Sequence, residues 1–219
     1  MGKGKMARYV NSSDDLAPLF TRGEDIVTPI FWDFKRQPEK GSIHVSGERY
    51  VLFRSSSMAS ALHQQLKSVL GPGADVAIYQ TGKSIGADDA SYYLEKTRSG
   101  ECSIRLAVGP VTFAFQGLAK VNILEDSSIT PDEDFLLVYE HPNAFEAEAV
   151  MQRGIQVDGP VDFFNAGYSA GWCSEACGLK LEAKEIACRA MGHETCRFVM
   201  APVKRLRERV KQIQDKYPL

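Results

Sequence analysis

The most restrictive feature of this 219-residue sequence is a group of thiol and carboxylate side chains near its C-terminal end. Glu185, Cys188 and Cys196 follow the spacing Glu-x2-Cys-x7-Cys, and they lie in two short apolar runs that indicate a hairpin of strands, 180–187 and 195–200. Because a hairpin brings the ends of its two strands together, we expect the two thiols and the carboxylate to converge. Zinc accepts sulfur and oxygen ligands in tetrahedral geometry, so the spacing favours a metal site.

The remaining cysteines leave a second interpretation open. The chain has five cysteines, an odd number, and four of them (Cys173, Cys177, Cys188 and Cys196) lie in its last quarter. In a reducing compartment this clustering favours metal ligands or buried thiols over disulfides. His193, on the turn between the hairpin strands, offers a further ligand, whereas free cysteines are also common as small core residues.

The order of predicted elements indicates an α+β fold. The apolar spacing predicts helices over 58–69, 92–94, 143–152, 163–177 and 203–217, and strands over 42–53, 76–79, 103–108, 112–124 and 135–141, besides the C-terminal hairpin. Because strands and helices do not alternate regularly, we expect an antiparallel sheet packed with helices. Gly167 and Gly171 lie four residues apart on one helical face, which predicts close packing of that helix on the sheet.

Composition and charge exclude several classes of protein. The net charge is -2 and the pI is about 6.1, which argues against direct contact with nucleic acid. No apolar run approaches the roughly 20 residues of a membrane span, and the basic start lacks the apolar segment of a secretory signal. We therefore expect a cytoplasmic protein that does not contact membranes.

Motifs of catalysis are absent from the sequence, which favours a binding protein over an enzyme. There is no nucleophile elbow, zinc-protease helix or dinucleotide fingerprint. Gly82-Lys83-Ser84 is similar to the end of a phosphate-binding loop, but Ala77 stands where that loop requires glycine, so a turn into a helix is the better interpretation. His44 and His63 are expected on the surface.

The chain divides into an arm, a main domain and a terminal helix. We expect an N-terminal arm over 1–40, a main domain over 41–201 and a linker-like helix over 202–219. The apolar segment 30–34 and the three-four spacing after Val203 have no obvious partner within the chain, which predicts a homodimer. The basic charge of the terminal helix also suits a downstream regulatory protein.

Two sets of motifs carry a resemblance to a known family. The first is Asn165-Ala166-Gly167-Tyr168-Ser169-Ala170-Gly171-Trp172 followed by Glu185-x2-Cys188-x-Ala190-Met191-Gly192-His193-Glu194-x-Cys196-x-Phe198; the second is Gly41-Ser42-Ile43-x3-Gly47-x-Arg49-Tyr50-Val51-Leu52 with Gly82-x3-Gly86-x2-Asp89-Ala90. Over residues 28–201 the chain resembles the 4-vinyl reductase domain family, especially its version in aromatic-sensing sigma-54-dependent activators of phenol and toluene degradation. The resemblance implies a compact α+β domain that closes over a small hydrophobic molecule.

The same resemblance implies a structural zinc held by three cysteines and one glutamate. The glutamate falls on Glu185 and two of the cysteines fall on Cys188 and Cys196, but the third cysteine falls on Asp162. Aspartate ligates zinc too, although replacing a thiolate hardens the site and weakens zinc binding. Cys173 or Cys177 could compensate for the missing thiol.

The implied ligand pocket departs from the family in a similar way. The family's phenol-contacting histidine and tryptophan fall on Phe113 and His141, and Tyr139, Tyr168 and Trp172 match further pocket positions. One polar group therefore remains, which implies a ligand with one hydrogen-bonding group on an apolar body. The alternative is that these aromatic residues fill an ordinary core.

The resemblance implies a regulatory module that senses a small hydrophobic or aromatic molecule and signals through its C-terminal helix to a partner or an attached domain. An accessory protein or enzyme of tetrapyrrole metabolism is the main alternative, because stand-alone members of the family are associated with bacteriochlorophyll synthesis. A scaffold subunit, similar to those that tether vesicles, is a third.

Overall fold

The structure is a computed structural model that describes residues 7–98 and 100–217. Its helices are α1 (Ala17–Trp32), α2 (Ser55–Ser60), α3 (Leu66–Leu70), α4 (Gly73–Thr97), α5 (Cys102–Phe115), α6 (Phe145–Gln152), α7 (Phe163–Cys177) and α8 (Leu206–Lys216). Its strands are β1 (Val10–Asn11), β2 (Phe34–Gln37), β3 (Ser42–Val45), β4 (Glu48–Tyr50), β5 (Val121–Ile123), β6 (Leu137–His141), β7 (Leu181–Ala187) and β8 (Cys196–Pro202). Two short 3-10 helices, η1 (Pro38–Lys40) and η3 (Arg189–Met191), and one π-helical turn, η2 (Ala61–Gln65), complete the order.

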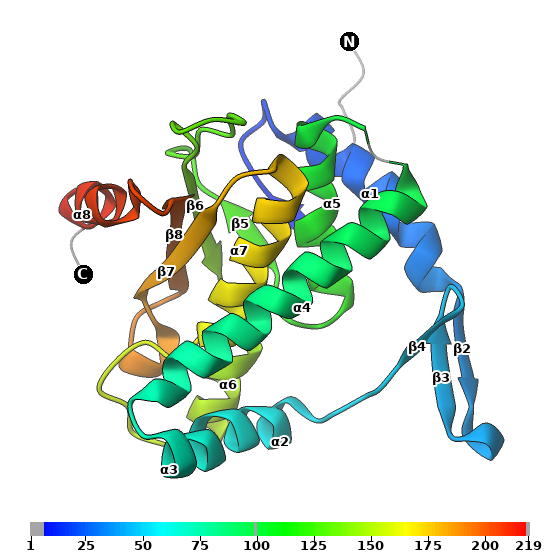
Figure 1. Ribbon diagram of the computed structural model, residues 1–219, viewed down its shortest axis with the longest axis horizontal. Coiled ribbons are helices and arrows are strands. Elements are labelled where there is room, and N and C mark those ends of the chain that lie inside the picture. The colour runs from blue at the N-terminus through cyan, green and yellow to red at the C-terminus, as the bar shows by residue number, and fades with distance from the viewer. Residues whose placement is uncertain (1–6, 99, 218–219) are drawn as a thin grey trace.

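The main sheet has five strands in the order β1-β5-β6-β8-β7. Strands β5, β6, β8 and β7 pair antiparallel, and only the two-residue β1 pairs parallel, with β5. The predicted α+β class with an antiparallel sheet is therefore confirmed. Helices α7, α5 and α4 lie on one side of this sheet, and α8 lies on the other (Figure 1).

Strand β6 separates two apolar layers, because its side chains alternate between the two faces of the sheet. Leu137 and Tyr139 belong to the main core, which α5 and α7 cover. Leu136, directly before the strand, and Val138 belong to a second cluster on the opposite face, which Val210 and Ile213 of α8 cover. The same strand therefore contacts the core helices on one side and the C-terminal helix on the other.

Helices α4 and α7 approach each other through glycines. A Cβ on Gly167 would lie 2.0 Å from the Tyr79 carbonyl oxygen, and a Cβ on Gly171 would lie 2.0 Å from that of Lys83. Across the interface, a Cβ on Gly86 would lie 2.1 Å from the Tyr168 carbonyl oxygen. The predicted close approach is present, but the neighbour is the backbone of α4 and not the sheet.

Several predicted strands are helical in the structure. Residues 76–79 lie inside α4, and residues 103–108 with the first part of 112–124 lie inside α5, so that only Val121–Ile123 forms a strand there. Helix α5 is buried around most of its circumference, and an all-apolar segment loses the 3.6-residue pattern that distinguishes a helix from a buried strand. The face of α4 that packs on α7 carries glycines, whereas the buried face of an ordinary amphipathic helix carries large apolar residues.

The N-terminal part contains a helix that docks and a small sheet that projects. Phe31 at the end of α1 stacks on Phe115 and Tyr93, with ring centroids 5.0 and 5.8 Å apart. The adjacent Trp32 is 72% exposed. Strands β2, β3 and β4 form a separate three-stranded antiparallel sheet that extends away from the rest of the molecule (Figure 1).

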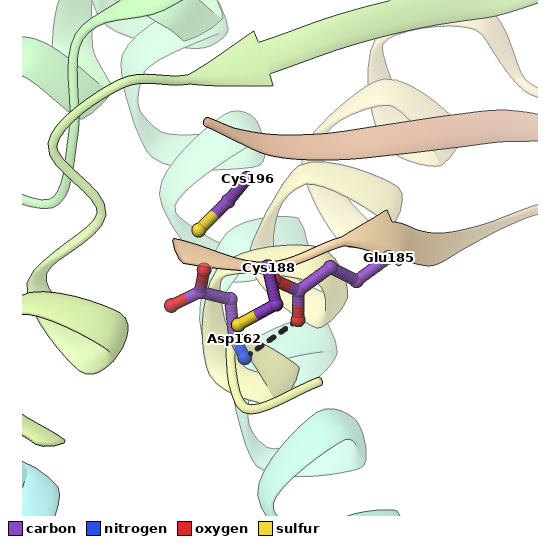
Figure 2. A group of neighbouring side chains, drawn as sticks. All are labelled: Asp162, Glu185, Cys188 and Cys196. Atoms are coloured by element: carbon purple, nitrogen blue, oxygen red, sulfur yellow. Dashed lines mark hydrogen bonds between the residues drawn. The ribbon is translucent and has the colours of Figure 1, made fainter. Parts of the chain in front are cut away.

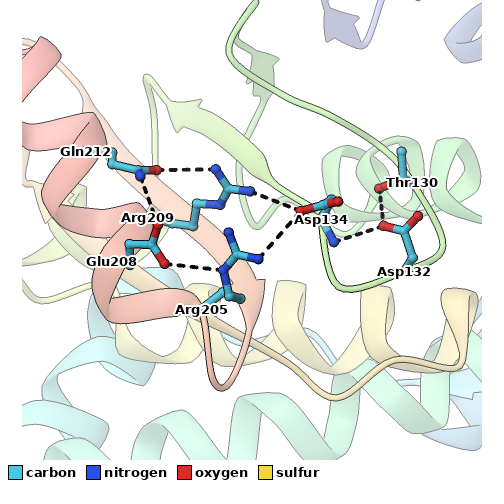
Figure 3. A network of polar contacts seen from close by, with 7 residues as sticks. All are labelled: Thr130, Asp132, Asp134, Arg205, Glu208, Arg209 and Gln212. Atoms are coloured by element: carbon cyan, nitrogen blue, oxygen red, sulfur yellow. Dashed lines mark hydrogen bonds and ion pairs between the residues drawn. The ribbon is translucent and has the colours of Figure 1, made fainter.

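Helix α8 is held at both ends by the connection between β5 and β6. Arg205 and Arg209 approach the carboxylate of Asp134, at 3.5 and 3.6 Å, as Figure 3 shows. At the other end, Lys216 and Tyr217 donate hydrogen bonds to Asp126, at 2.5 and 2.6 Å. None of the helices within residues 7–98 and 100–217 combines the length and the hydropathy that a membrane span requires.

Candidate functional site

A small apolar cavity lies between α5, α7 and the inner face of β5 and β6, with a volume of about 40 Å³. Its walls are predominantly apolar and come from segments far apart in the sequence. The lining residues are Gly109, Pro110 and Phe113 of α5; Val121 and Ile123 of β5; Leu137, Tyr139 and His141 of β6; and Tyr168, Ser169, Trp172 and Cys173 of α7.

All five side chains that the sequence predicts for a ligand pocket line this one cavity: Phe113, Tyr139, His141, Tyr168 and Trp172. Each of them is at least 97% buried. The structure therefore brings together, from three separate elements, the residues that the family resemblance implies for the pocket. Their role in binding a ligand remains a prediction.

His141 is the unusual polar group of the cavity. It is completely buried, and neither of its ring nitrogens has a hydrogen-bond partner among the described residues. The rings of Phe113, Tyr139 and Phe198 surround it, with centroids 5.1, 5.2 and 4.6 Å from the imidazole. Burial lowers the pKa of His141 to about 3, so the ring is neutral and presents one donor and one acceptor. A buried group of this kind carries a free-energy penalty that a bound polar atom would relieve.

The tyrosines of the cavity differ in how their hydroxyls are used. The Tyr168 hydroxyl donates a 2.7 Å hydrogen bond to Asp89 of α4, and Gln116 donates a 2.8 Å bond to the same carboxylate oxygen. Burial raises the pKa of Tyr139 well above its ordinary value of 10.0, so that hydroxyl stays protonated. Tyr168 therefore contributes its ring to the wall while its polar end is satisfied by α4.

The cavity is too small for an aromatic ring as it stands. A volume of about 40 Å³ accommodates roughly one water molecule, whereas an engineered apolar cavity that binds benzene measures about 150 Å³. Binding an aromatic molecule therefore requires wall side chains to move outward. Phe113 is the bulky α5 side chain that contacts both His141 and Tyr168, with ring centroids 5.1 and 5.4 Å away.

A second cluster of functional side chains lies beside the N-terminal end of α7. The ligand atoms of Asp162, Glu185, Cys188 and Cys196 all lie within 4.8 Å of one another, and all four residues are buried. Asp162 directly precedes α7, Glu185 lies on β7, and the cysteines flank the connection between β7 and β8, as Figure 2 shows. The structure therefore brings together the four residues of the predicted metal site.

The two carboxyl groups of the cluster are buried close together and are only partly hydrogen-bonded. Glu185 accepts a 2.9 Å hydrogen bond from the Asp162 amide, and Asp162 accepts a 3.0 Å bond from the Ala147 amide. One oxygen of each carboxylate is buried without a hydrogen-bond partner among the described residues. Burial and the neighbouring Glu146 raise the pKa of Asp162 to about 8, and burial and Asp162 raise the pKa of Glu185 to about 12.

The thiols of Cys188 and Cys196 interact through a hydrogen bond. The hydrogen bond with Cys196 lowers the pKa of Cys188 to about 6, and the same interaction raises the pKa of Cys196. Two orphaned carboxylate oxygens and two facing sulfurs form a donor set that fits a divalent cation such as zinc. Binding a cation would favour the deprotonated carboxylates and thiols, and the charge of the cation would compensate the negative charge that they then carry.

The other residues considered for the metal lie elsewhere. The Nδ1 atom of His193 lies 3.0 Å from the Cys188 carbonyl oxygen and 3.2 Å from its amide nitrogen, so this histidine braces the turn and is outside the cluster. Cys173 lines the apolar cavity, and Cys177 contacts Cys102. Neither Cys173 nor Cys177 therefore replaces the thiol that Asp162 lacks.

The expectation that His63 lies on the surface is wrong. It is 93% buried on the π-helical turn η2, and its Nε2 atom lies 3.1 Å from Glu146. Glu146 also accepts hydrogen bonds from the first amides of α7, those of Phe164 and Asn165. The carboxylate is stabilised there because helix N-termini favour negative charge. No sequence motif distinguishes this pair, since its two members are 83 residues apart.

Two family models match separate segments of the chain. The 4-vinyl reductase domain family matches residues 143–202, and the family described as activator of aromatic catabolism matches residues 32–127. The first match includes the four clustered residues and α7; the second includes Phe113. Tyr139 and His141 lie between the two matched segments.

Two regulators and one solved sensory domain are similar to this chain. The chain is 26% identical over 163 residues to the transcriptional regulatory protein XylR of Pseudomonas putida, covering 73% of this chain and 28% of that protein. It is 23% identical over 181 residues to the phenol regulator MopR of Acinetobacter guillouiae, covering 82% of this chain and 31% of that protein. The phenol-responsive sensory domain of the transcription activator PoxR, solved with phenol, has the same fold with a TM-score of 0.72 and 21% identity, covering 90% of this chain and 98% of that domain. The chain thus spans less than a third of the two regulators it matches.

Proposed function

We propose that this chain, in which an N-terminal region of the aromatic-catabolism activators precedes a 4-vinyl reductase domain, is the ligand-sensing module of a regulatory protein. The ligand is a small molecule with an aromatic body and one hydrogen-bonding group. The observation that carries this proposal is His141, a neutral, fully buried imidazole without a partner among the described residues, on a predominantly apolar cavity. The phenol regulator and the phenol-responsive sensory domain among the similar proteins support the same class of ligand.

The size and shape of the cavity support a single-ring compound over a tetrapyrrole. Opening a 40 Å³ cavity to the roughly 150 Å³ of a benzene site requires wall side chains such as Phe113 to move outward. A tetrapyrrole has four rings and would require the separation of α5 and α7 from the sheet. Nothing in the comparisons favours tetrapyrrole chemistry, and the similarity to regulators supports sensing.

The route of the signal follows strand β6. Tyr139 and His141 face the cavity, and the opposite face of the strand packs with α8 through Val138. The connection that enters β6 also holds the arginines of α8 through Asp134 (Figure 3). A ligand that displaces β6 therefore changes the packing of α8, the element through which we propose that the module signals to a partner or an attached domain.

The ligand proposal is tested by comparing phenol with toluene, which has a similar ring but no hydroxyl. We expect phenol to bind the wild-type protein more tightly than toluene in calorimetric titrations. In His141→Ala the phenol affinity should fall by about 0.5–1.5 kcal/mol, a two- to thirteenfold change, while toluene is affected less. His44→Ala, on the projecting sheet, is the matched control. Equal affinities for the two compounds in both proteins would refute the anchoring role of His141.

We also propose that Asp162, Glu185, Cys188 and Cys196 hold a structural zinc ion. Bound there, the ion would neutralise the buried acidic groups and tie β7 and β8 to the start of α7. Elemental analysis of protein purified without chelator should give about one zinc per chain. Cys188→Ser should release the metal and lower the melting temperature, because binding at a structural site contributes to folding free energy. Asp162→Cys should tighten binding, whereas a metal-free wild-type protein would overturn the proposal.

A homodimer joined through the projecting sheet is the third proposal. Apolar side chains gather where this sheet meets the body of the molecule: Trp32 and Phe53 are each 72% exposed, and Val51 and Leu52 are 65% and 62% exposed. A two-fold dimer would bury this patch on both copies. Light scattering at micromolar concentration should give twice the chain mass, and Trp32→Ser with Phe53→Ser should give a folded monomer. A monomeric wild-type protein would contradict the proposal.

A further inference from the structure

Helices α5 and α7 carry a pair of thiols where their ends meet. Cys102 is the first residue of α5 and Cys177 is the last residue of α7, and their sulfur atoms lie 3.0 Å apart. Both side chains are half-buried, so small solutes in solvent reach them. The two residues are 75 positions apart in the sequence, and no spacing motif connects them.

The backbone around this thiol pair is held in place by other contacts between the same helices. The Arg105 guanidinium donates a 3.1 Å hydrogen bond to the Glu175 carbonyl oxygen, and the Trp172 indole donates a 3.3 Å bond to the Arg105 carbonyl oxygen. Two rigid helices thus present the sulfur atoms to each other, and a shift of about 1 Å brings them to bonding distance.

We propose that Cys102 and Cys177 form a reversible disulfide when the protein meets a peroxide. Burial raises the pKa of the Cys177 thiol, so Cys102, the first residue of α5, supplies the attacking sulfur. The Cys102 sulfur attacks one peroxide oxygen, the O–O bond breaks, and a sulfenic acid and one water molecule form. The Cys177 sulfur then attacks the sulfenic sulfur, the S–O bond breaks, and a second water molecule leaves as the S–S bond forms.

The net reaction consumes two thiols and one hydrogen peroxide and yields one disulfide and two water molecules, so hydrogen and oxygen balance. Sulfur is oxidised and the peroxide oxygens are reduced. Thiol reductants reverse the bond by exchange. Burial and the neighbouring thiol raise the pKa of Cys177, which makes this pair slower to react than an exposed catalytic cysteine.

A disulfide at this position would restrict the two helices that form the cavity wall. Helix α5 contributes Gly109 and Phe113 to the cavity wall, and α7 contributes Tyr168 and Trp172. A covalent link between the two helices opposes the outward movement that an aromatic ring requires. This second step rests on the proposed ligand-sensing function, and it predicts that the oxidised protein binds phenol about tenfold more weakly than the reduced protein.

The disulfide is tested first, without any ligand. Purified protein is treated with millimolar hydrogen peroxide, its free thiols are blocked, and tryptic peptides are analysed by mass spectrometry. We expect a peptide of residues 99–105 linked to a peptide of residues 154–180, and its loss after treatment with a thiol reductant. These peptides are distinct from 185–189 and 190–197, which carry Cys188 and Cys196 of the proposed metal site.

Three variants assign the bond. Cys102→Ser and Cys177→Ser should each abolish the linked peptide, whereas Cys173→Ser, whose thiol shares a peptide with Cys177, should retain it. Absence of the linked peptide in the wild-type protein, or its persistence in Cys177→Ser, would overturn the assignment.

The consequence for the cavity is measured separately by calorimetric titration of phenol into reduced and oxidised protein. A tenfold loss of affinity on oxidation that is absent in Cys102→Ser supports the link between the bond and the cavity. Equal affinities before and after complete cross-linking would overturn that link while leaving the disulfide established. A reduced protein that binds no phenol would contradict the proposed function, a result that the peptide analysis does not depend on.

Discussion

Replacing Phe113 by alanine should convert the small cavity into a site for a benzene ring. Phe113 is 3% exposed and lines the cavity, so removing its ring adds nearly the volume of benzene to the existing 40 Å³. The sum approaches the roughly 150 Å³ of an engineered cavity that takes up benzene. We expect the substitution to lower the free energy of unfolding by about 3–5 kcal/mol, the usual range for a buried phenylalanine.

Small aromatic compounds should restore a large part of this loss. A ligand at about 100 times its dissociation constant stabilises the native state by about 2.7 kcal/mol. For a chain of this length, each kcal/mol corresponds to roughly 2–4 °C in melting temperature, so benzene or phenol should raise the melting temperature of Phe113→Ala by about 5–11 °C. Differential scanning calorimetry with and without ligand measures both quantities. Should the alanine variant fail to fold, Phe113→Leu provides a smaller enlargement.

Phe20→Ala is the matched control for this experiment. Phe20 is 2% exposed on α1 and does not line the cavity, so its replacement should destabilise the protein to a similar extent without creating a site beside His141. Equal rescue of both variants by benzene would show that the compound fills any buried void. No rescue of Phe113→Ala would refute the argument that this side chain limits the size of the cavity.

Three further outcomes are expected. Gly171→Ala should lower stability by about 1–3 kcal/mol in urea unfolding, since its Cβ would lie 2.0 Å from a carbonyl oxygen of α4, whereas Gly73→Ala, which meets no atom within 4 Å, should not destabilise. When the pH falls from 6.5 to 5, the free energy of unfolding of the wild-type protein should decrease by up to about 2 kcal/mol more than that of His141→Phe. The reason is that His141 binds a proton in the unfolded chain but not in the folded protein, where its pKa is about 3. Replacing Arg205 and Arg209 together by alanine should change global stability by less than about 1 kcal/mol but speed amide hydrogen exchange in α8.

The sequence predicts the hairpin and its Glu185, Cys188 and Cys196 because their information is local, whereas Asp162 joins the cluster through the family resemblance alone. Cys188 and Cys196 lie close in the sequence, on two strands joined by a short turn, so strand pairing alone brings them together. The same holds for α7, whose small residues at fixed spacing predict a close helix contact. Which backbone makes that contact is decided by α4, a segment far earlier in the chain, and no local pattern specifies this pairing.

The cavity residues are predicted from the family resemblance alone, and there is a physical reason why composition and spacing do not predict them. Phe113 and Trp172 become neighbours of His141 only after α5 and α7 pack on the sheet, and composition or spacing cannot indicate such a convergence. Burial on most sides also removes the helical pattern of α5, so the sequence predicts strands there. The burial of His63 escapes prediction because its partner Glu146 lies on a distant helix.

The most direct test of ligand sensing at His141 is nuclear magnetic resonance of the histidine ring nitrogens during a phenol titration. The chain has four histidines, and His141 is the one among them on the cavity. We predict that saturating phenol shifts the two ring-nitrogen signals that are lost in His141→Ala, consistent with a new hydrogen bond to a neutral imidazole, while the signals of His44 and His193 stay in place. If phenol saturates the protein and the His141 signals do not move, the ligand binds elsewhere and the proposed sensing site is wrong.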